Sequence, residues 1–263
     1  MQEIDRMKKY PRTPHIAGSR LQAGDEDLSQ ISPEIILGRH IVIEEKVDGA
    51  NCGISFSPEG ELLLQSRGHY LIGGARERDF NLFKQWANMH CEALYEVLGS
   101  RYIVYGEWLY VKHKIYYDRL PHYFLEFDVW DKQKEVFLDT PSRQLLLSPL
   151  PIVSVPVLAS GKFSSLSAIL SYMGNSRYIS AEHLENLRKT AEQHHLDVET
   201  ILRETDPSLQ MEGLYIKVEE EGMVVDRMKY VRHSYLQNAE ESTKRWLDRP
   251  IVPNQMIGNL FDC

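Results

Sequence analysis

The sequence has few cysteines and no long apolar run. Its three cysteines, Cys52, Cys91 and Cys263, are far apart and form no Cys-x-x-Cys pair. This argues against a disulfide framework or a zinc site and predicts the reduced thiols that are usual in the cytoplasm. No stretch approaches the ~20 apolar residues of a membrane span, and residues 1–11 lack the apolar centre of a signal peptide. We therefore expect a cytoplasmic protein without a membrane partner.

The sequence also lacks an excess of positive charge. Its 30 Lys and Arg face 38 Asp and Glu, which gives a formal net charge of −8. Most nucleic-acid-binding domains are basic, so the composition alone argues mildly against nucleic acid as a partner. Net charge does not exclude a local basic groove, however, because the field at a site depends on the nearest charges. The length suits one large domain, or one domain with a small appendage.

Short strands and helices alternate along the chain. Ile- and Val-rich segments divided by turns predict strands between residues 41 and 68. Apolar residues at helical spacing predict a helix over 78–98 and a helical region over 180–205, with Ser180 as a candidate N-cap. Further strands are predicted at 101–111, 123–131, 152–158, 212–220 and 226–232. Together these elements predict an α+β fold with mostly antiparallel strands.

The sharpest local signal for chemistry is Glu45-Lys46-Val47-Asp48-Gly49. Lys-x-Asp-Gly alone is weak, since a strand that ends in an Asp-Gly turn can carry a solvated lysine. Five further segments follow it in order: Ser66-Arg67-Gly68, Tyr105-Gly106-Glu107-Trp108, Phe124-Leu125-Glu126-Phe127-Asp128, Glu212-Gly213-Leu214-Tyr215-Ile216-Lys217 and Arg227-Met228-Lys229.

The order and spacing of these segments resemble the covalent nucleotidyltransferase superfamily of DNA ligases, RNA ligases and mRNA capping enzymes. The resemblance covers residues 41–232 and implies a nucleotidyltransferase (ligase adenylation domain) fold of antiparallel sheets flanked by helices. It also implies that Lys46 attacks the α-phosphate of ATP and carries AMP. A protonated lysine is a poor nucleophile, so we expect Lys217, Lys229 and a bound Mg²⁺ to lower the pKa of Lys46.

The resemblance assigns further roles. Glu107 and Glu212 are expected to contact the ribose or to bind Mg²⁺ or Mn²⁺. Arg67 is expected at the ribose or at the 5′-phosphate of the nucleic acid, which its planar fork suits. The expected catalytic residues are Lys46, Asp48, Glu107, Glu212, Lys217 and Lys229. The expected nucleotide-binding residues are Glu45, Lys46, Asn51, Arg67, Glu107, Phe127, Glu212, Lys217, Arg227 and Lys229.

Two aromatic residues compete for the place beside adenine. Phe124 and Phe127 point to opposite faces of their predicted strand. One of them stacks on adenine and the other fills the core. The Phe-Asp-hydrophobic pattern matches the family best with Phe127 as the stacking residue, but the sequence leaves both alternatives open.

The residues around Lys46 look like the RNA ligase 2 branch. An acidic residue, Glu45, precedes the lysine, and Asn51 follows it. The resemblance implies that Glu45 approaches the adenine amino group and that Asn51 approaches the ribose or sugar–phosphate region. Residues 9–20 also resemble the segment before the core in bacterial and phage RNA ligases. The chain departs from the family pattern at Arg227, where a lysine is usual.

We expect residues 1–235 to form the nucleotidyltransferase domain, with a helical insertion at about 160–208, and residues 236–263 to form a short tail. About thirty residues follow Arg232, too few for a five-stranded barrel, so no complete C-terminal OB-fold is expected. The predicted function is an ATP-dependent RNA ligase that seals 5′-phosphate and 3′-hydroxyl ends in RNA repair, through lysyl-AMP and an adenylylated 5′ end. An end-healing kinase/phosphatase is a candidate partner. A minimal ATP-dependent DNA ligase and a catalytically silent nucleic-acid end-binding protein are the alternatives.

Overall fold

A mostly antiparallel sheet dominates the computed structural model, which describes residues 7–20, 30–237 and 249–261. The main strand order is β10 (Val157–Lys162), β3 (His40–Lys46), β11 (Gly213–Glu220), β12 (Met223–Val231), β8 (Val136–Leu138), β7 (Phe124–Asp131), β6 (Tyr102–Trp108), β4 (Ala50–Phe56) and β5 (Leu62–Ser66). Three short strands, β1 (His15–Ile16), β2 (Gln30–Ile31) and β9 (Val153–Ser154), lie off this path and pair in parallel. The predicted α+β class is confirmed.

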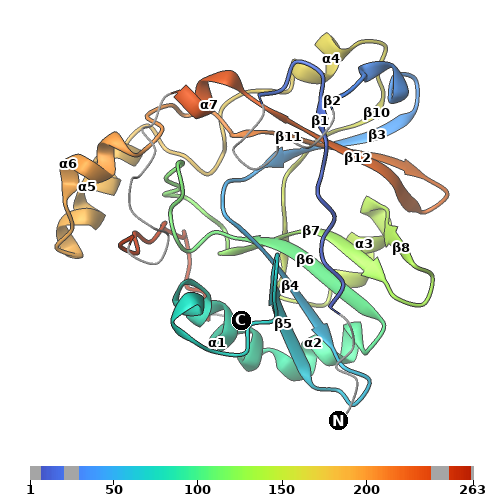
Figure 1. Ribbon diagram of the computed structural model, residues 1–263, viewed down its shortest axis with the longest axis horizontal. Coiled ribbons are helices and arrows are strands. Elements are labelled where there is room, and N and C mark those ends of the chain that lie inside the picture. The colour runs from blue at the N-terminus through green and yellow to red at the C-terminus, as the bar shows by residue number, and fades with distance from the viewer. Residues whose placement is uncertain (1–6, 21–29, 238–248, 262–263) are drawn as a thin grey trace.

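The sheet has two halves, which lie one above the other in Figure 1. The upper half contains β10, β3, β11 and β12, and the lower half contains β8, β7, β6, β4 and β5. Between β12 and β8 the register joins only Met223 to Leu138 and Val224 to Phe137. The chain crosses from one half to the other between β3 and β4, at residues 47–49. Lys46, the last residue of β3, is therefore placed at the junction.

Helices cover the lower half near β4 and β5 (Figure 1). The helix expected over 78–98 is two helices, α1 (Asn81–Met89) and α2 (Cys91–Leu98), separated at His90 and preceded by the 3-10 helix η2 (Ala75–Phe80). Their buried side chains share one apolar cluster with β4, β6 and β7. A second 3-10 helix, η1, spans Pro33–Ile35, and α3 spans Thr140–Leu147.

The region expected to be helical, 160–208, contains α4 (Leu166–Leu170), α5 (His183–Gln193) and α6 (Val198–Arg203). Figure 1 shows α5 and α6 side by side at the left edge of the molecule. Ser180 was predicted to cap the long helical region, but the N-cap residue of α5 is Glu182. The Ser180 hydroxyl instead donates a hydrogen bond to Asp118 at 2.5 Å, which fastens the segment before α5 to the loop after β6.

The chain ends against the loop that follows β6. After α7 (His233–Gln237), residues 249–261 return to the body, where the buried Asn254 accepts a hydrogen bond from the Tyr117 amide at 2.9 Å and donates one to the Leu109 carbonyl at 2.7 Å. Residues 238–248 and 262–263 of the expected tail lie outside the described residues. Among the helices that the structure describes, none combines the length and the apolar character that crossing a bilayer requires.

Candidate active site

A cavity of about 540 Å³ lies at the junction of the two halves. Residues from β3, β4, β5, β6, β7, β11 and β12 line it, together with residues of the N-terminal segment. Nine of the eleven predicted site residues are on its wall: Glu45, Lys46, Asp48, Asn51, Arg67, Glu107, Phe127, Glu212 and Lys229.

The ammonium group of Lys46 faces this cavity and is paired with Glu212. Lys46 Nζ donates a hydrogen bond to Glu212 Oε2 at 2.6 Å; the lysine side chain is 21% exposed and the glutamate 1%. The register of β3 and β11 creates this pair by placing Lys46 opposite Gly213. A Cβ at Gly213 would lie 1.9 Å from the Tyr230 carbonyl oxygen. Only glycine therefore lets β11 approach β12 closely at this point.

Carboxylates control the charge of Lys46. Burial lowers the pKa of Lys46, but Glu212, Glu107 and Asp48 outweigh burial and hold that pKa above its ordinary value. The expectation that Lys217 and Lys229 lower the pKa of Lys46 is therefore wrong, while the effect expected of a bound Mg²⁺ stays a prediction. The physical reason is proximity, because the nearest charged group is the Glu212 carboxylate.

Asp48 fixes the turn after Lys46. Its Oδ2 accepts hydrogen bonds from the amides of Lys114 and Ile115, each at 2.9 Å, and its Oδ1 lies 3.6 Å from His113 Nδ1. Burial opposes ionisation of Asp48, but His113 and the Ile115 amide outweigh it and lower the pKa of Asp48 to about 2. The aspartate thus stays ionised and ties the turn to the loop that follows β6.

The glycine of the same turn is required by close packing. A Cβ at Gly49 would lie 2.7 Å from the carbonyl oxygen of Trp108 and 2.7 Å from Cδ2 of Leu109. The Asp48-Gly49 pair therefore combines a fixed carboxylate with a backbone that can pass directly against β6.

Glu107 faces Lys46 from the other half of the sheet. It is the register partner of Asn51 on β4, and both line the cavity. Burial raises the pKa of Glu107 to about 7, although Lys46 and His113 act in the opposite direction. A further positive charge beside this carboxyl group would stabilise its ionised form.

Two acceptor atoms of cavity-lining residues have neither a hydrogen bond nor an ion pair, unlike Glu44 Oε2, which pairs with Lys217. Among the described residues, Glu45 Oε1 and Asn51 Oδ1 are buried without a partner. Buried polar atoms are usually paired, so these two atoms suit a ligand that brings donors. Burial also raises the pKa of Glu45 to about 7.

The family of the chain follows from comparison with known proteins. A family model named RNA ligase matches residues 39–231, which is most of the chain. This chain belongs to the RNA ligase family. No curated protein sequence matches it.

Solved structures of Naegleria gruberi RNA ligase share the fold of this RNA ligase family member. A mutant with ATP and Mn is 15% identical, with a TM-score of 0.52, and the match covers 79% of this chain and 54% of that one. A mutant with AMP and Mn is 17% identical, with a TM-score of 0.51, and the match covers 87% of this chain and 63% of that one. The present chain therefore spans between about half and two thirds of that ligase. At these identities the likeness shows the fold alone.

The structure separates the two aromatic candidates of this RNA ligase family member. Phe127 lies on the cavity wall, with its ring centroid 5.0 Å from that of Tyr10 and 6.3 Å from that of Tyr215. Phe124 is fully buried in the core, 5.5 Å from the ring of Phe83. Only Phe127 is placed to meet a ligand in the cavity.

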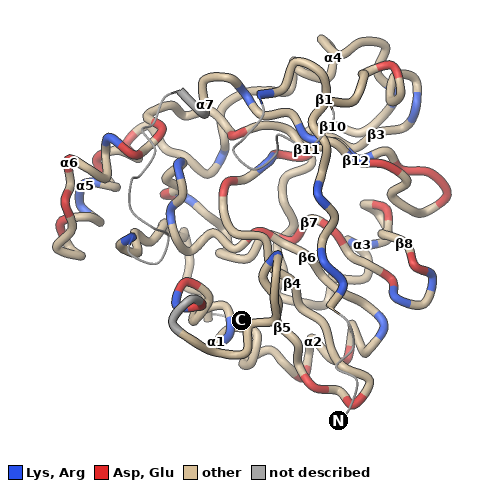
Figure 2. Tube along the Cα trace, viewed as in Figure 1, with Lys and Arg blue, Asp and Glu red and all other residues tan. Residues whose placement is uncertain are grey.

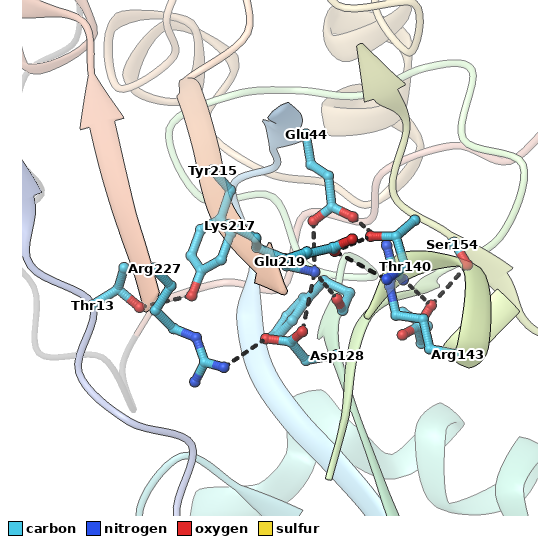
Figure 3. A network of polar contacts seen from close by, with 12 residues as sticks. Thr13, Glu44, Asp128, Thr140, Arg143, Ser154, Tyr215, Lys217, Glu219 and Arg227 are labelled. Atoms are coloured by element: carbon cyan, nitrogen blue, oxygen red, sulfur yellow. Dashed lines mark hydrogen bonds and ion pairs between the residues drawn. The ribbon is translucent and has the colours of Figure 1, made fainter. Parts of the chain in front are cut away.

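Lys217 does not reach the cavity, contrary to the sequence prediction. Its side chain is completely buried, and its ammonium group donates to the Phe127 carbonyl and pairs with Glu44 at 2.9 Å and Asp128 at 3.1 Å (Figure 3). Glu44 in turn pairs with Arg143, which is buried as well. Lys217 therefore supports the strand that carries Phe127 and has no access to a ligand.

Arg227 also lies off the cavity wall. Its guanidinium group lies 3.9 Å from the ring centroid of Phe137 and 3.8 Å from Asp128. Arg227 shares a strand face with Lys229, but two residues further along β12 correspond to about 7 Å. Lys229 lines the cavity, whereas Arg227 lies behind Tyr10, 5.4 Å from the centroid of its ring.

Several residues on the cavity wall carry no recognisable signal in the sequence. Tyr10 and Thr13 belong to a proline-rich segment without periodicity, and the hydroxyl groups of Tyr10 and Thr13 lie 2.6 Å and 2.8 Å from that of Tyr215. His113 comes from an irregular loop, where a lone histidine carries no recognisable signal. In the same N-terminal segment, His15 is buried and bonded to Ser19 at 2.7 Å, so it does not face the cavity.

Protein ligands alone do not form a metal site. Within the described ranges, no group of three or more His, Cys, Asp and Glu side chains is arranged to hold a metal ion. The predicted metal ligands Glu107 and Glu212 are both on the cavity wall. Any metal ion there would need oxygen atoms of a bound ligand to complete its coordination.

Proposed function

We propose that this protein is an ATP-dependent RNA ligase that carries AMP covalently on Lys46. The observation that carries this proposal is the Lys46 amine, held 2.6 Å from Glu212 in a cavity at the junction of two half-sheets. Membership of the RNA ligase family supports it. The similar structures that hold ATP or AMP with Mn support the choice of nucleotide and of a divalent metal.

The first step is transfer of AMP to the enzyme. After Lys46 loses a proton, its nitrogen attacks the α-phosphorus of ATP. A nitrogen–phosphorus bond forms, the bond to the β-phosphate oxygen breaks, and pyrophosphate leaves. Glu212 orients the amine and is close enough to accept its proton. Lys229, on the same wall, offers positive charge to the phosphates.

The cavity residues suit the nucleoside. Phe127 offers a ring for stacking on adenine, and stacking on an aromatic side chain is worth about 1–3 kcal/mol per base. The orphaned Glu45 Oε1 and Asn51 Oδ1 can accept hydrogen bonds from the adenine amino group and a ribose hydroxyl. Arg67 is exposed at the cavity and is available to the ribose or to the 5′-phosphate of an incoming strand.

Mg²⁺ or Mn²⁺ fits beside Glu107 and Glu212. Mg²⁺ usually takes one or two protein carboxylates together with substrate phosphates and water, in agreement with the absence of a larger ligand cluster among the described residues. The raised pKa of Glu107 means that this carboxyl group gains from a nearby cation. When bound, the metal supplies positive charge that neutralises the phosphates.

The next two steps seal the strand. A 5′-phosphate oxygen of RNA attacks the phosphorus of the lysine-bound AMP, the phosphorus–nitrogen bond breaks, and Lys46 regains a proton. The 3′-hydroxyl oxygen of the adjoining end then bonds to the phosphorus of that 5′-phosphate and releases its proton to water, the bond between the two phosphates breaks, and AMP leaves. This chemistry needs 5′-phosphate and 3′-hydroxyl ends. It would therefore serve RNA repair, beside an end-healing kinase/phosphatase that produces such ends.

The first test is covalent labelling. The full chain is incubated with α-labelled ATP and Mg²⁺ or Mn²⁺ and then separated under denaturing conditions. We expect a labelled band that pyrophosphate discharges and that Lys46→Ala abolishes. A folded protein that takes no label from ATP, GTP or NAD would instead be the silent end-binding alternative.

The second test separates RNA ligation from DNA ligation. Matched nicks that differ only in the 2′-hydroxyl of the 3′-terminal nucleotide are offered to the labelled enzyme, since this hydroxyl distinguishes RNA from DNA. Sealing that requires the 2′-hydroxyl is the expected result. Equal sealing of both nicks would favour the minimal DNA ligase.

A further inference from the structure

A second cavity of about 350 Å³ adjoins the one around Lys46. The two cavities share only Asp48 and His113, so these residues form the wall between them. The Lys and Arg residues that line the second cavity come from three segments far apart in the sequence. They are Arg78 in η2, Lys112 and Lys114 in the loop after β6, and Arg249 in the segment that returns to the body.

The second cavity is the more basic of the two. Four Lys or Arg and three carboxylates line it, whereas three Lys or Arg and five carboxylates line the first cavity. Asp79 and Arg78 pair with each other at 3.3 Å, which leaves three Lys or Arg against Asp48 and Glu204. Asp48 is already engaged by two backbone amides of the loop after β6. The lining therefore favours an anion.

Lys112 is the cation most in need of a counter-charge. Its ammonium group donates to the carbonyl oxygens of His113 at 2.8 Å and Glu204 at 3.2 Å. Within the described residues it forms no ion pair with a carboxylate. Burial lowers the pKa of Lys112 to about 8. Two carbonyl dipoles hold this ammonium group in place, and an anion would supply the charge that they lack.

One group of carboxylates lies away from the second cavity. The hairpin between β11 and β12 is marked by carboxylates in Figure 2 and lies at the opposite side of the view from residues 249–261. Its tip contains Glu219, Glu220 and Glu221. The balance of charges on the cavity wall, and not the net charge of −8, describes the second cavity.

We propose that the second cavity binds a phosphate group of the RNA strand beside the ligation junction, with Lys112 and Arg249 as its main contacts. This inference rests on the proposed function. The other source of phosphate is the polyphosphate tail of ATP. That tail is fixed at its α-phosphate by Lys46 and would have to pass the ionised carboxylate of Asp48. A strand can enter on the side of Arg78, whose side chain is 37% exposed.

The test compares matched charge removals at the second cavity and far from it. Lys112→Ala and Arg249→Ala are the cavity variants. Lys162→Ala and Arg39→Ala are the controls: Lys162 is exposed and lies opposite His40, at the other end of β3 from Lys46, and Arg39 pairs with Glu220 at the acidic hairpin. Each protein is measured for binding of a 5′-phosphorylated nicked RNA at several salt concentrations, and for self-adenylation with α-labelled ATP.

We expect each cavity variant to bind the nicked RNA roughly 5- to 20-fold more weakly and to lose about 0.7–0.9 from the salt slope, the value for one phosphate contact. We expect self-adenylation to stay within about twofold of the parent, because the nucleotide occupies the other cavity. The two controls should leave RNA binding and self-adenylation unchanged.

Three outcomes would overturn the proposal. Loss of self-adenylation with intact RNA binding would assign the cavity to the ATP tail, and no change in either measurement would leave it without a phosphate. Lys112→Ala could lower RNA binding, self-adenylation and the melting temperature together. In that case Lys112→Arg decides, because it keeps the charge. Restored RNA binding in Lys112→Arg supports the proposal, and unrestored binding overturns it. RNA binding is measured without ligation. A parent protein that binds nicked RNA but takes no label from ATP would therefore overturn the proposed function and leave the phosphate site standing.

Discussion

The two cavities on either side of Asp48 and His113 have opposite charge balance. The cavity around Lys46 has more carboxylates than Lys and Arg, and its neighbour has fewer. An acidic wall suits the ammonium group of Lys46 and the metal ion proposed beside it, while a basic wall suits phosphate. The difference shows that a chain with a net charge of −8 can keep a locally basic cavity.

The largest expected effect separates the cavities completely. Lys46→Ala should abolish covalent labelling by ATP, a loss of at least ~1,000-fold, because no other group replaces the nucleophile. RNA binding through the second cavity should remain within about twofold. Labelling by α-labelled ATP and binding of nicked RNA measure the two quantities in the same preparation.

Lys46→Arg is the matched control for this variant. It keeps a positive charge beside Glu212 but has no nucleophilic amine, so it should fold normally and take no label. A covalent adenylate in either variant would show that AMP is carried elsewhere and that the acidic cavity has another purpose.

The next effect concerns the carboxylate opposite Lys46. Glu107→Ala should slow single-turnover self-adenylation by about 100-fold, because a metal ligand and part of the charge balance disappear together. Glu92→Ala, an exposed position on α2, should leave the rate unchanged. RNA binding should be unchanged in both variants. An unaltered rate of self-adenylation in Glu107→Ala would show that Glu107 is not a metal ligand.

Self-adenylation and RNA binding should depend on pH in opposite directions, with a change of roughly tenfold in self-adenylation. Without a bound metal the pKa of Glu107 lies near 7, so protons compete with the metal ion for this carboxylate more strongly at pH 6 than at pH 8. Self-adenylation should therefore rise by up to about tenfold across this range, and Glu107→Gln should remove the inflection near pH 7. RNA binding should move the other way, since the pKa of Lys112 is about 8 and its charge is lost above that pH. Parallel pH profiles for the two activities would contradict the division.

The smallest expected effect distinguishes the cavity wall from the core. Phe127→Ala should raise the KM for ATP by about tenfold, the equivalent of one lost stacking contact, with little change in melting temperature. Phe124→Ala should instead destabilise the fold by about 3–5 kcal/mol because it empties a buried site. Initial-rate kinetics and thermal unfolding of both variants measure this contrast, and the reverse pattern would reject Phe127 as the stacking residue.

The sequence by itself determined the parts that local chemistry encodes. Ile- and Val-rich segments divided by turns predicted most of the long strands, helical spacing predicted one helical segment where α1 and α2 lie, and Asp48-Gly49 predicted the turn after Lys46. The order of the six segments indicated the family that the comparison then confirmed. These features depend on neighbours along the chain, so a single sequence is enough to find them.

Only the tertiary structure decided which side chains face the cavity. Strand alternation allowed either Phe124 or Phe127, and the packing of Phe124 on Phe83 settled the choice. Lys217 looked like a ligand-binding lysine, but its ion pairs with Glu44 and Asp128 hold it in the core. The second cavity brings residues 78, 112 and 249 together. Such contacts depend on register and packing between distant segments, and no local pattern in the sequence records them.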